Sequence, residues 1–295
     1  MTPRQIALAL VPPFCFGTGF TIAKPAMVHF PPLFTMMLAY GGIALVLMIS
    51  RREPLRTPWR HIVLVAALAV TIQGALLFWG LAGMQATAAN LILQIQVPFA
   101  IFWGWLLAGE RVSGRKIVGT AIAVAGVVAV IGLPAEPPPL LASLMTIAAA
   151  FIWALGQVLA QKLGRDGGVG QLKANAYGGA PQLALASLLL EHGQLEAVRT
   201  ATPQQWAMLA FVACVGFGLA YVSWYSLLRQ VRVDEAAPFV LLMPVFGIAT
   251  AVLLLGEQVS LPQLMGGGVI LSGLAIVAGA GLPRNKRHRA VNPVP

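Results

Sequence analysis

Ten apolar blocks, separated by short polar or charged connections, follow one another along almost the whole chain. Each block is close to the roughly 20 residues that an α-helix needs to cross the hydrocarbon core of a bilayer. The blocks are Ile6–Ala23, Pro32–Ser50, Ile62–Gly83, Ala88–Ala108, Gly114–Ile131, Leu141–Leu163, Ala174–Leu190, Trp206–Leu228, Ala236–Leu255 and Pro262–Gly281. Short connections favour antiparallel neighbours in a bundle. The pattern therefore predicts an all-α integral membrane protein with ten transmembrane helices.

Composition supports the membrane interpretation. Apolar residues make up 58% and charged residues 9% of the 295 positions, compared with about 45–50% and about 25% in soluble domains. So much apolar surface cannot be buried inside one soluble core. Cys15 and Cys214 fall inside apolar blocks, which predicts small packed residues rather than a disulfide. The first block contains Pro12 and Pro13 and lacks a small-residue cleavage site, so we expect a retained helix rather than a signal peptide.

The positive charges are distributed by side of the membrane. The chain carries 19 Lys and Arg and a formal net charge of +10. If the N-terminus is cytoplasmic, all of these residues except Lys24 and Arg199 fall on the cytoplasmic side of the ten-helix arrangement. This is the positive-inside pattern. It predicts that both termini are cytoplasmic, and it assigns the basic balance to topology in a lipid bilayer rather than to nucleic-acid binding.

The two halves of the chain are copies of one unit. Ala89–Gly132 aligns without gaps on Ala236–Gly279 at an offset of 147, and a Gly-Glu-x-Val-Ser junction occurs in both segments. Nearer the start, an offset of 137 pairs an Ala-Tyr-Gly-Gly run with its copy and Phe16 with Trp153. We therefore expect two five-helix repeats, at residues 1–135 and 136–295, in one membrane domain.

The odd number of helices per repeat predicts that the repeats are inverted. The second copy must enter the membrane from the side opposite to the first. The charges agree, because Arg111, Arg115 and Lys116 of the first copy correspond to Gln258, Pro262 and Gln263 of the second. Inverted repeats place a binding site near the bilayer midplane and can exchange shapes to open on alternate sides. The pattern indicates transport.

Several short motifs resemble the drug/metabolite transporter superfamily, in particular its ten-helix EamA-type members. They are Phe16-Gly17-Thr18, Pro31-Pro32-Leu33, Leu107-Ala108-Gly109-Glu110-Arg111-Val112-Ser113, Pro244-Val245-Phe246 and Leu254-Leu255-Gly256-Glu257. The resemblance covers almost the whole chain and implies a cavity lined by helices 1, 3, 4, 6, 8 and 9. It also implies a multi-pass protein of a bacterial-type inner membrane. Within the superfamily the chain is most similar to the aromatic amino-acid exporters of the YddG type.

Nine residues are candidates for substrate binding. They are Lys24, Phe78, Asn90, Gln94, Trp153, Gln157, Tyr221, Trp224 and Tyr225. Lys24 either snorkels to the headgroups or attracts a substrate carboxylate at the outer mouth of the cavity. The amides either bind the substrate's ammonium or carboxylate or join helices by hydrogen bonds. The aromatic residues of the eighth helix either stack on the substrate or pack against neighbouring helices.

Other chemistry is missing from the sequence. It contains no Gly-x-x-x-x-Gly-Lys-Ser/Thr phosphate loop, no His, Cys or carboxylate cluster at metal-ligand spacing, and no Ser nucleophile paired with a His. We therefore expect no cofactor and no bound metal. All nine acidic residues fall in connections or at helix ends, which argues against ion coupling at membrane depth. The leading interpretation is a monomeric exporter of amino acids; the alternatives are a channel-like pore and an intramembrane enzyme.

Overall fold

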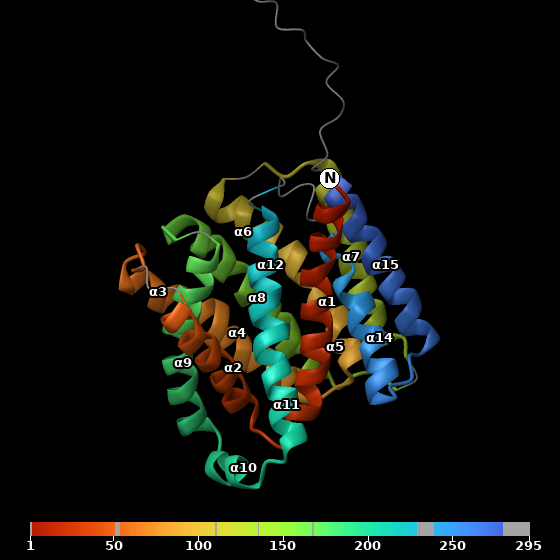
Figure 1. The fold of residues 1–295 in the computed structure, drawn as a ribbon. Helices are drawn as coiled ribbons and strands as arrows, with labels where there is room; N and C mark the ends of the chain where they lie inside the picture. The colour runs from red at the N-terminus through yellow and green to blue at the C-terminus, as the bar shows by residue number, and fades with distance from the viewer. Residues whose placement is uncertain are drawn as a thin grey trace, which may run out of the picture.

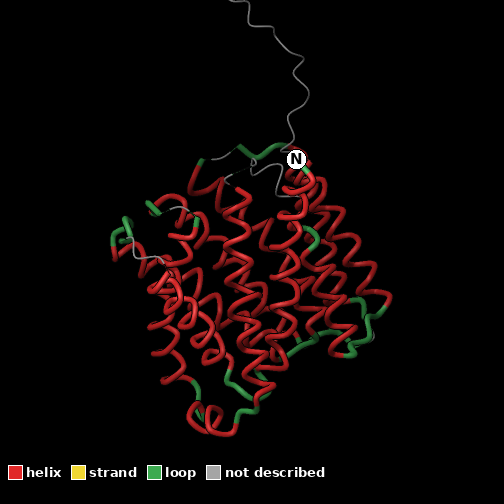
Figure 2. The backbone as a smooth tube through the Cα atoms, viewed as in Figure 1, coloured by secondary structure: helices red, strands yellow, loops and turns green. Residues whose placement is uncertain are grey.

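The computed structural model describes residues 2–50, 54–109, 111–134, 136–166, 168–228, 230 and 239–279, without the side chains of Tyr225 and Leu228. Within these ranges the chain consists of helices and connections and contains no strand (Figure 2). The helices run roughly antiparallel as one bundle (Figure 1). The predicted all-α fold is confirmed.

Within the described residues, ten helical rods make up the bundle. They are α1 (Pro3–Ala26), α2 (Pro32–Ser50), α3 to α4 (Trp59–Ala66 and Gln73–Ala82), α5 to α6 (Ala86–Ile92 and Gln96–Ala108), α7 (Gly114–Gly132), α8 (Leu140–Leu163), α9 (Val169–Leu190), α11 to α12 (Pro203–Phe211 and Ala220–Leu228), α14 (Met243–Leu255) and α15 (Leu261–Gly279). Eight of them are long and apolar enough to cross a membrane. The 22-residue α9 and the shorter α14 complete the ten.

The predicted blocks match these rods closely, with two differences. α9 begins at Val169, five residues before the predicted Ala174, so the charged Lys173 lies inside the helix, where its side chain is buried and its ammonium lies 5.3 Å from the ring centroid of Tyr177. A short helix, α10 (Gln194–Thr200), was not predicted between α9 and α11. The predicted start at Ala236 and the predicted end at Gly281 lie outside the described residues.

Local chemistry explains where the helices begin and end. The hydroxyl of Ser113 accepts a hydrogen bond from the N–H of Lys116 at the start of α7, and Ser260 does the same for Gln263 at the start of α15. Serine is among the residues preferred at the N-cap position. α6 and α14 end at Gly109 and Gly256, which have positive φ angles of 68° and 65°. That conformation favours glycine and terminates both helices in the same way.

The packing follows the inverted repeat. α2 packs against α9 and α7 against α15, so each helix of these pairs meets its own copy. α1 packs against α14 and the α11–α12 rod, and its copy α8 packs against α6 and the α3–α4 rod. In Figure 1 the α2–α9 and α7–α15 pairs lie on opposite sides of α1. The two inverted five-helix repeats are thus present in the tertiary contacts.

Small residues bring the helices together at matching positions. A Cβ on Gly119 of α7 would lie 2.6 Å from the carbonyl oxygen of Gly273 of α15. At the repeat-related position, Gly126 meets Gly266, and a Cβ on Gly126 would lie 2.9 Å from the Gly266 carbonyl oxygen. Close approach of this kind drives helix association in lipid, where apolar burial alone gives little preference for a partner helix.

The long rods of helices 3 and 8 both contain a π-helical segment near their middle. The segments are Ala67–Ile72 and Val212–Leu219, which largely coincide under the repeat offset. Gly216 in the second segment lies directly against Gly19 of α1, and Ala69 in the first lies directly against Gly156 of α8. π-Helical turns recur at functional sites. These two crossings flank the centre of the bundle, where the repeats meet.

Candidate functional site

An aromatic cluster occupies the centre of the bundle between the two repeats. The rings of Phe16 on α1 and Tyr221 on α12 meet edge to face, with centroids 5.0 Å apart. Tyr221 is also hydrogen-bonded to the side chains of Trp153 on α8 and Tyr40 on α2. An indole can only donate, so the N–H of Trp153 points at the Tyr221 oxygen. Phe16 and Trp153 are repeat-related, so equivalent positions of both repeats converge on one tyrosine.

The cluster extends towards α1 and the π-helical segment of the eighth rod. The ring of Phe217 lies 5.8 Å from that of Phe20 and 5.4 Å from that of Tyr40, measured between centroids. Tyr40 and Phe217 are buried. We name Phe16, Phe20, Tyr40, Trp153, Phe217 and Tyr221 the central aromatic cluster. Such a group can stack on a flat side chain and also offers hydroxyl and indole groups to a polar one.

The predicted aromatic face of the eighth helix is divided. Tyr221 belongs to the central aromatic cluster, whereas Trp224 packs with Leu8, Ala9 and Phe239 in a separate group. That group lies at the end of the bundle where α1 begins. The side chain of Tyr225 lies outside the described residues.

The other predicted residues of helices 3, 4 and 6 lie outside the central aromatic cluster. Phe78 of α4 is completely buried in the main core. A cavity of about 10 Å³ lies beside it; its lining residues are Phe20, Leu77, Leu81, Ala89, Asn90 and Leu93. This volume is close to the minimum for one water molecule. Gln157, the repeat counterpart of Phe20, is half-buried on α8.

Two buried amides line up on the fourth rod. The Asn90 side-chain N–H donates to the Thr21 hydroxyl at 3.2 Å and to the Ala86 carbonyl at 2.9 Å. The Gln94 side-chain N–H donates to the backbone carbonyl of Asn90 at 3.3 Å. Their side-chain oxygens are buried without a hydrogen-bond partner in the structure. A buried acceptor without a hydrogen-bond partner costs free energy, so these two oxygens favour the binding of a polar group that donates a hydrogen bond.

Lys24 has a partner that the sequence analysis did not include. Its ammonium lies 3.1 Å from a carboxylate oxygen of Glu257 in the connection between α14 and α15. The two carboxylate oxygens also accept hydrogen bonds from the backbone N–H groups of Ala86 and Thr87, at 2.7 and 2.9 Å. Glu257 thus caps the start of α5. The carboxylate is shielded from water, because its side chain is only 8% exposed.

The environment keeps Glu257 ionised at neutral pH. Burial by itself raises the pKa of this carboxyl, but the N–H groups of Thr87 and Ala86 and the Lys24 ammonium outweigh burial and hold the pKa below its ordinary value. A carboxyl with a lowered folded pKa stabilises the fold above its unfolded pKa, and that contribution is lost as pH falls through the folded pKa. The contact is therefore intact throughout the neutral range.

Sequence reasoning omitted Phe16, Tyr40 and Glu257 from the site. Signals for the first two were available, since Phe16 pairs with Trp153 under the repeat offset and Tyr40 stands in the repeated Ala-Tyr-Gly-Gly run. Glu257 had a weaker signal, because a Gly-Glu junction after an apolar block also fits a solvated helix end. Only the fold brings that carboxylate to α5.

Known proteins are similar to this chain over almost its whole length. Residues 4–132 and 140–279 each match the EamA-like transporter family. A protein of Escherichia coli K12 named "Probable amino-acid metabolite efflux pump" is 31% identical over 290 residues, which cover 94% of this chain and 95% of that protein. Its namesake in Salmonella typhimurium LT2 is also 31% identical, over 94% and 95% of the two chains. One crystal structure superposes with a TM-score of 0.66 at 18% identity, covering 93% of this chain and 98% of that one.

The family match and the helical fold define a polytopic membrane transporter, which excludes the enzyme alternative. The chain belongs to the EamA-like transporter family. Its relatives are bacterial transporters that match almost its full length. A lipid bilayer is accordingly its surrounding medium.

Proposed function

We propose that this transporter exports neutral amino acids, aromatic ones included, through the central aromatic cluster by alternating access. The observation that carries the proposal is the convergence of Phe16 and Trp153, one from each repeat, on Tyr221. A site shared by inverted repeats can be exposed to either side when the repeats exchange shapes. The names of the Escherichia coli and Salmonella relatives support an amino-acid-derived substrate and outward movement.

The chemistry of the cluster fits such a substrate. The aromatic faces suit an apolar or aromatic side chain, and burial there contributes roughly 25 cal/mol per Å² before the entropy losses of binding. The oxygens of Asn90 and Gln94, on the fourth rod beyond Phe20, can accept hydrogen bonds from an ammonium group. Phe78, Gln157, Trp224, Tyr225 and Lys24 remain proposed contributors along the path. A monomer suffices, since one chain supplies both halves of the site.

Counterflow in proteoliposomes tests the proposal. Vesicles loaded with unlabelled phenylalanine are expected to accumulate labelled phenylalanine transiently, and to do so when ionophores have collapsed every ion gradient. The reason is that no acidic residue of the chain lies in the middle of a predicted helix, where a coupling ion would bind. Empty liposomes and vesicles loaded with a sugar are the controls.

Two results would count against separate parts of the proposal. If no amino acid in a panel of aromatic, aliphatic and small members exchanges, the substrate class is wrong. If exchange occurs but stops when a protonophore is added, the absence of ion coupling is wrong. Currents of single-channel size would instead favour the channel-like pore.

The orientation is part of the proposal. We expect the end of the bundle at which α1 begins, here named the basic end, to face the cytoplasm, because all Lys and Arg except Lys24 and Arg199 are assigned to that side. The opposite end, with Lys24, α10 and Glu257, is named the far end. A reporter fused after Pro295 that is active only in the cytoplasm should be active, and one active only outside should be silent. The reverse pattern would contradict the assignment.

A further inference from the structure

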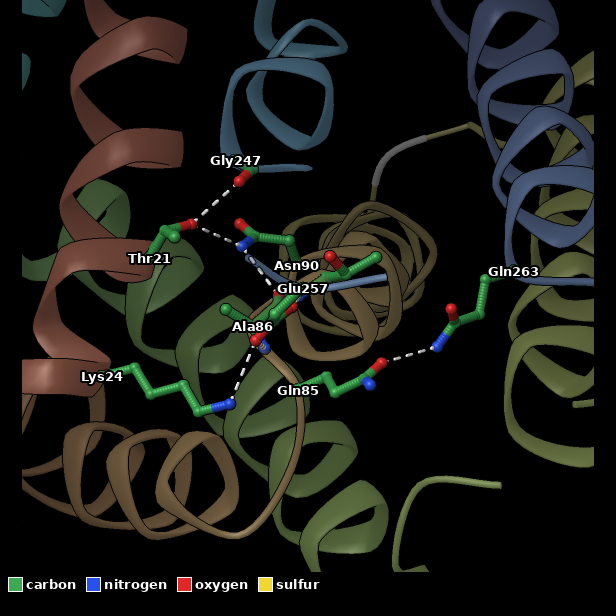
Figure 3. Close-up of polar contacts among 9 residues, drawn as sticks. Thr21, Lys24, Gln85, Ala86, Asn90, Gly247, Glu257 and Gln263 are labelled. Carbon is green, nitrogen blue, oxygen red and sulfur yellow. Dashed lines mark hydrogen bonds and ion pairs between the residues drawn. The ribbon is translucent and has the colours of Figure 1, made fainter. Parts of the chain in front are cut away.

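The far end is closed around a single carboxylate. Glu257, in the connection between α14 and α15, contacts Lys24 of α1 at 3.1 Å and the N–H groups of Ala86 and Thr87, which open α5. Figure 3 shows the Lys24 ammonium and the Ala86 backbone converging on Glu257 from different helices. One side chain of the second repeat thereby holds two helices of the first. We name these four residues the far-end latch.

A second layer lies one turn deeper in the membrane. The Thr21 hydroxyl of α1 contacts the carbonyl oxygen of Gly247 on α14 at 3.1 Å, and the Asn90 amide donates to the same hydroxyl (Figure 3). A Cβ on Gly247 would lie 2.7 Å from the Asn90 side chain, so α14 and α5 touch without a gap. The Gln263 amide of α15 also donates to the Gln85 side-chain oxygen at 3.2 Å. These contacts join α1, α5, α14 and α15 at the far end of the bundle.

The repeat provides an internal comparison at the basic end. Under the offsets of 137 and 147, Glu257 corresponds to Glu110, but Lys24 corresponds to Gln161 and Thr21 to Val158. Asn90 corresponds to Ala237; Glu110 and Ala237 lie outside the described residues. The sequence therefore keeps a carboxylate at both junctions, whereas the positions that match Lys24 and Thr21 hold a neutral amide and an apolar residue.

We infer that Glu257, acting with Lys24, is a positioning residue that makes the far-end-closed conformation the resting state of the transport cycle. The inference rests on the alternating access of the proposed function. Each conformation of an inverted-repeat carrier breaks the contacts that close one end. A difference in strength between the two sets of contacts sets the populations of the two conformations. The latch and the layer beneath it join helices of both repeats at the far end, so we expect this set of contacts to be the stronger one and the empty carrier to present its site to the basic end.

The latch is also built to open. The side chain of Lys24 is 28% exposed while that of Glu257 is 8% exposed, so water reaches the cation first when α1 moves away. The carboxylate keeps the two backbone donors of α5 during that step. Sequential release of this kind lets the far end open without leaving an unpaired charge among apolar residues.

Cysteine labelling measures the state of the latch directly. In a background with Cys15 and Cys214 replaced by alanine, A89C places a thiol at the small cavity behind the latch, where Ala89 is buried. A membrane-impermeant maleimide applied from the far end should label it slowly. K24Q gives position 24 the glutamine that stands at the matching basic-end position 161. In this variant the labelling rate should rise on the order of fivefold, and in E257Q it should rise by more. A separate variant carries L195C on the exposed part of α10, at the far end. Labelling of this thiol shows that the far end faces the reagent, whichever side of the membrane the far end occupies in the cell.

Matched variants separate the latch from general destabilisation. R199Q removes the other predicted far-end cation, which is exposed on α10, and should leave the rate unchanged. The double variant K24E/E257K should not restore slow labelling, because a lysine at position 257 cannot accept the N–H bonds of Ala86 and Thr87. Q161K should slow labelling of a thiol from the basic end. The inference is overturned if the labelling rates of K24Q and E257Q are both within twofold of the parent and equal to that of R199Q.

The outcome is independent of the substrate assignment. Faster far-end labelling in K24Q, in a protein that exchanges no amino acid, would support the latch and reject the proposed substrate. Amino-acid exchange in a protein whose labelling rate does not change with K24Q would support the proposed substrate and reject the latch. Where exchange is measurable, K24Q should lower the apparent KM for substrate added at the far end several-fold. The apparent KM for substrate added at the basic end should change by less than about twofold. The reason is that the conformation open to the far end is scarce in the parent, so only its population rises appreciably.

Discussion

Replacing Tyr221 with alanine is expected to reduce exchange of aromatic amino acids at least about tenfold while exchange of small ones falls much less. The substitution removes the edge-to-face contact with Phe16, worth about 0.5–1.5 kcal/mol beyond buried area. It also removes the hydrogen-bond acceptor of the half-buried Trp153, a loss of about 0.5–1.5 kcal/mol. Counterflow of phenylalanine and threonine, measured in the same variant, gives the ratio that tests this.

Two further variants serve as comparisons for the ratio of phenylalanine to threonine exchange. W105A removes an aromatic side chain that is 55% exposed on the surface of α6, outside the cluster, and should leave the ratio unchanged. W224A measures how far the site extends towards the basic end, where Trp224 packs with Leu8 and Ala9. If Y221A lowers thermal stability and slows both substrates equally, Tyr221 has a packing role and the central cluster is not the substrate site.

Replacing Gly273 with alanine is expected to lower the thermal unfolding temperature by many degrees, whereas the same change at Gly268 of the same helix should leave it unchanged or raise it. A Cβ on Gly273 would lie 2.5 Å from the backbone nitrogen of Ala123 and 2.6 Å from the carbonyl oxygen of Gly119, neither of which can move alone. Overpacking against a backbone costs about 1–3 kcal/mol or more. A Cβ on Gly268 would meet nothing within 4 Å, and alanine favours a helix by up to about 1 kcal/mol.

Unfolding of the purified variants in one detergent, followed by tryptophan fluorescence, compares them directly. The variant G119A, at the contact partner of Gly273, should destabilise as well, and G119A with G273A should deviate from additivity because the two positions touch. Equal unfolding temperatures for G273A and G268A would show that the α7–α15 contact does not hold the repeats together.

The sequence by itself determined the ten helices, their inverted duplication and the helix caps at Ser113 and Ser260. Each of these follows from interactions within one segment or with the bilayer. Lipid cannot hydrogen-bond the backbone, so an apolar block of this length must become a helix. Helix capping involves residues three positions apart, and a repeat with an odd number of helices must be inverted relative to its copy. α10 was missed because a seven-residue helix between two long ones carries no comparable signal.

Only the tertiary structure decided which helix faces meet. Lipid is as apolar as a neighbouring helix, so apolar residues mark no buried face in the sequence. Trp224 and Tyr221 stand on the same predicted face, yet they pack into different groups because α1 passes both of them at different depths. Glu257 reaches Ala86, 171 positions away, only when both repeats are assembled. Its carboxylate is buried rather than solvated because α5 supplies two N–H groups and α1 a cation, and neither contribution is written in the residues next to Glu257.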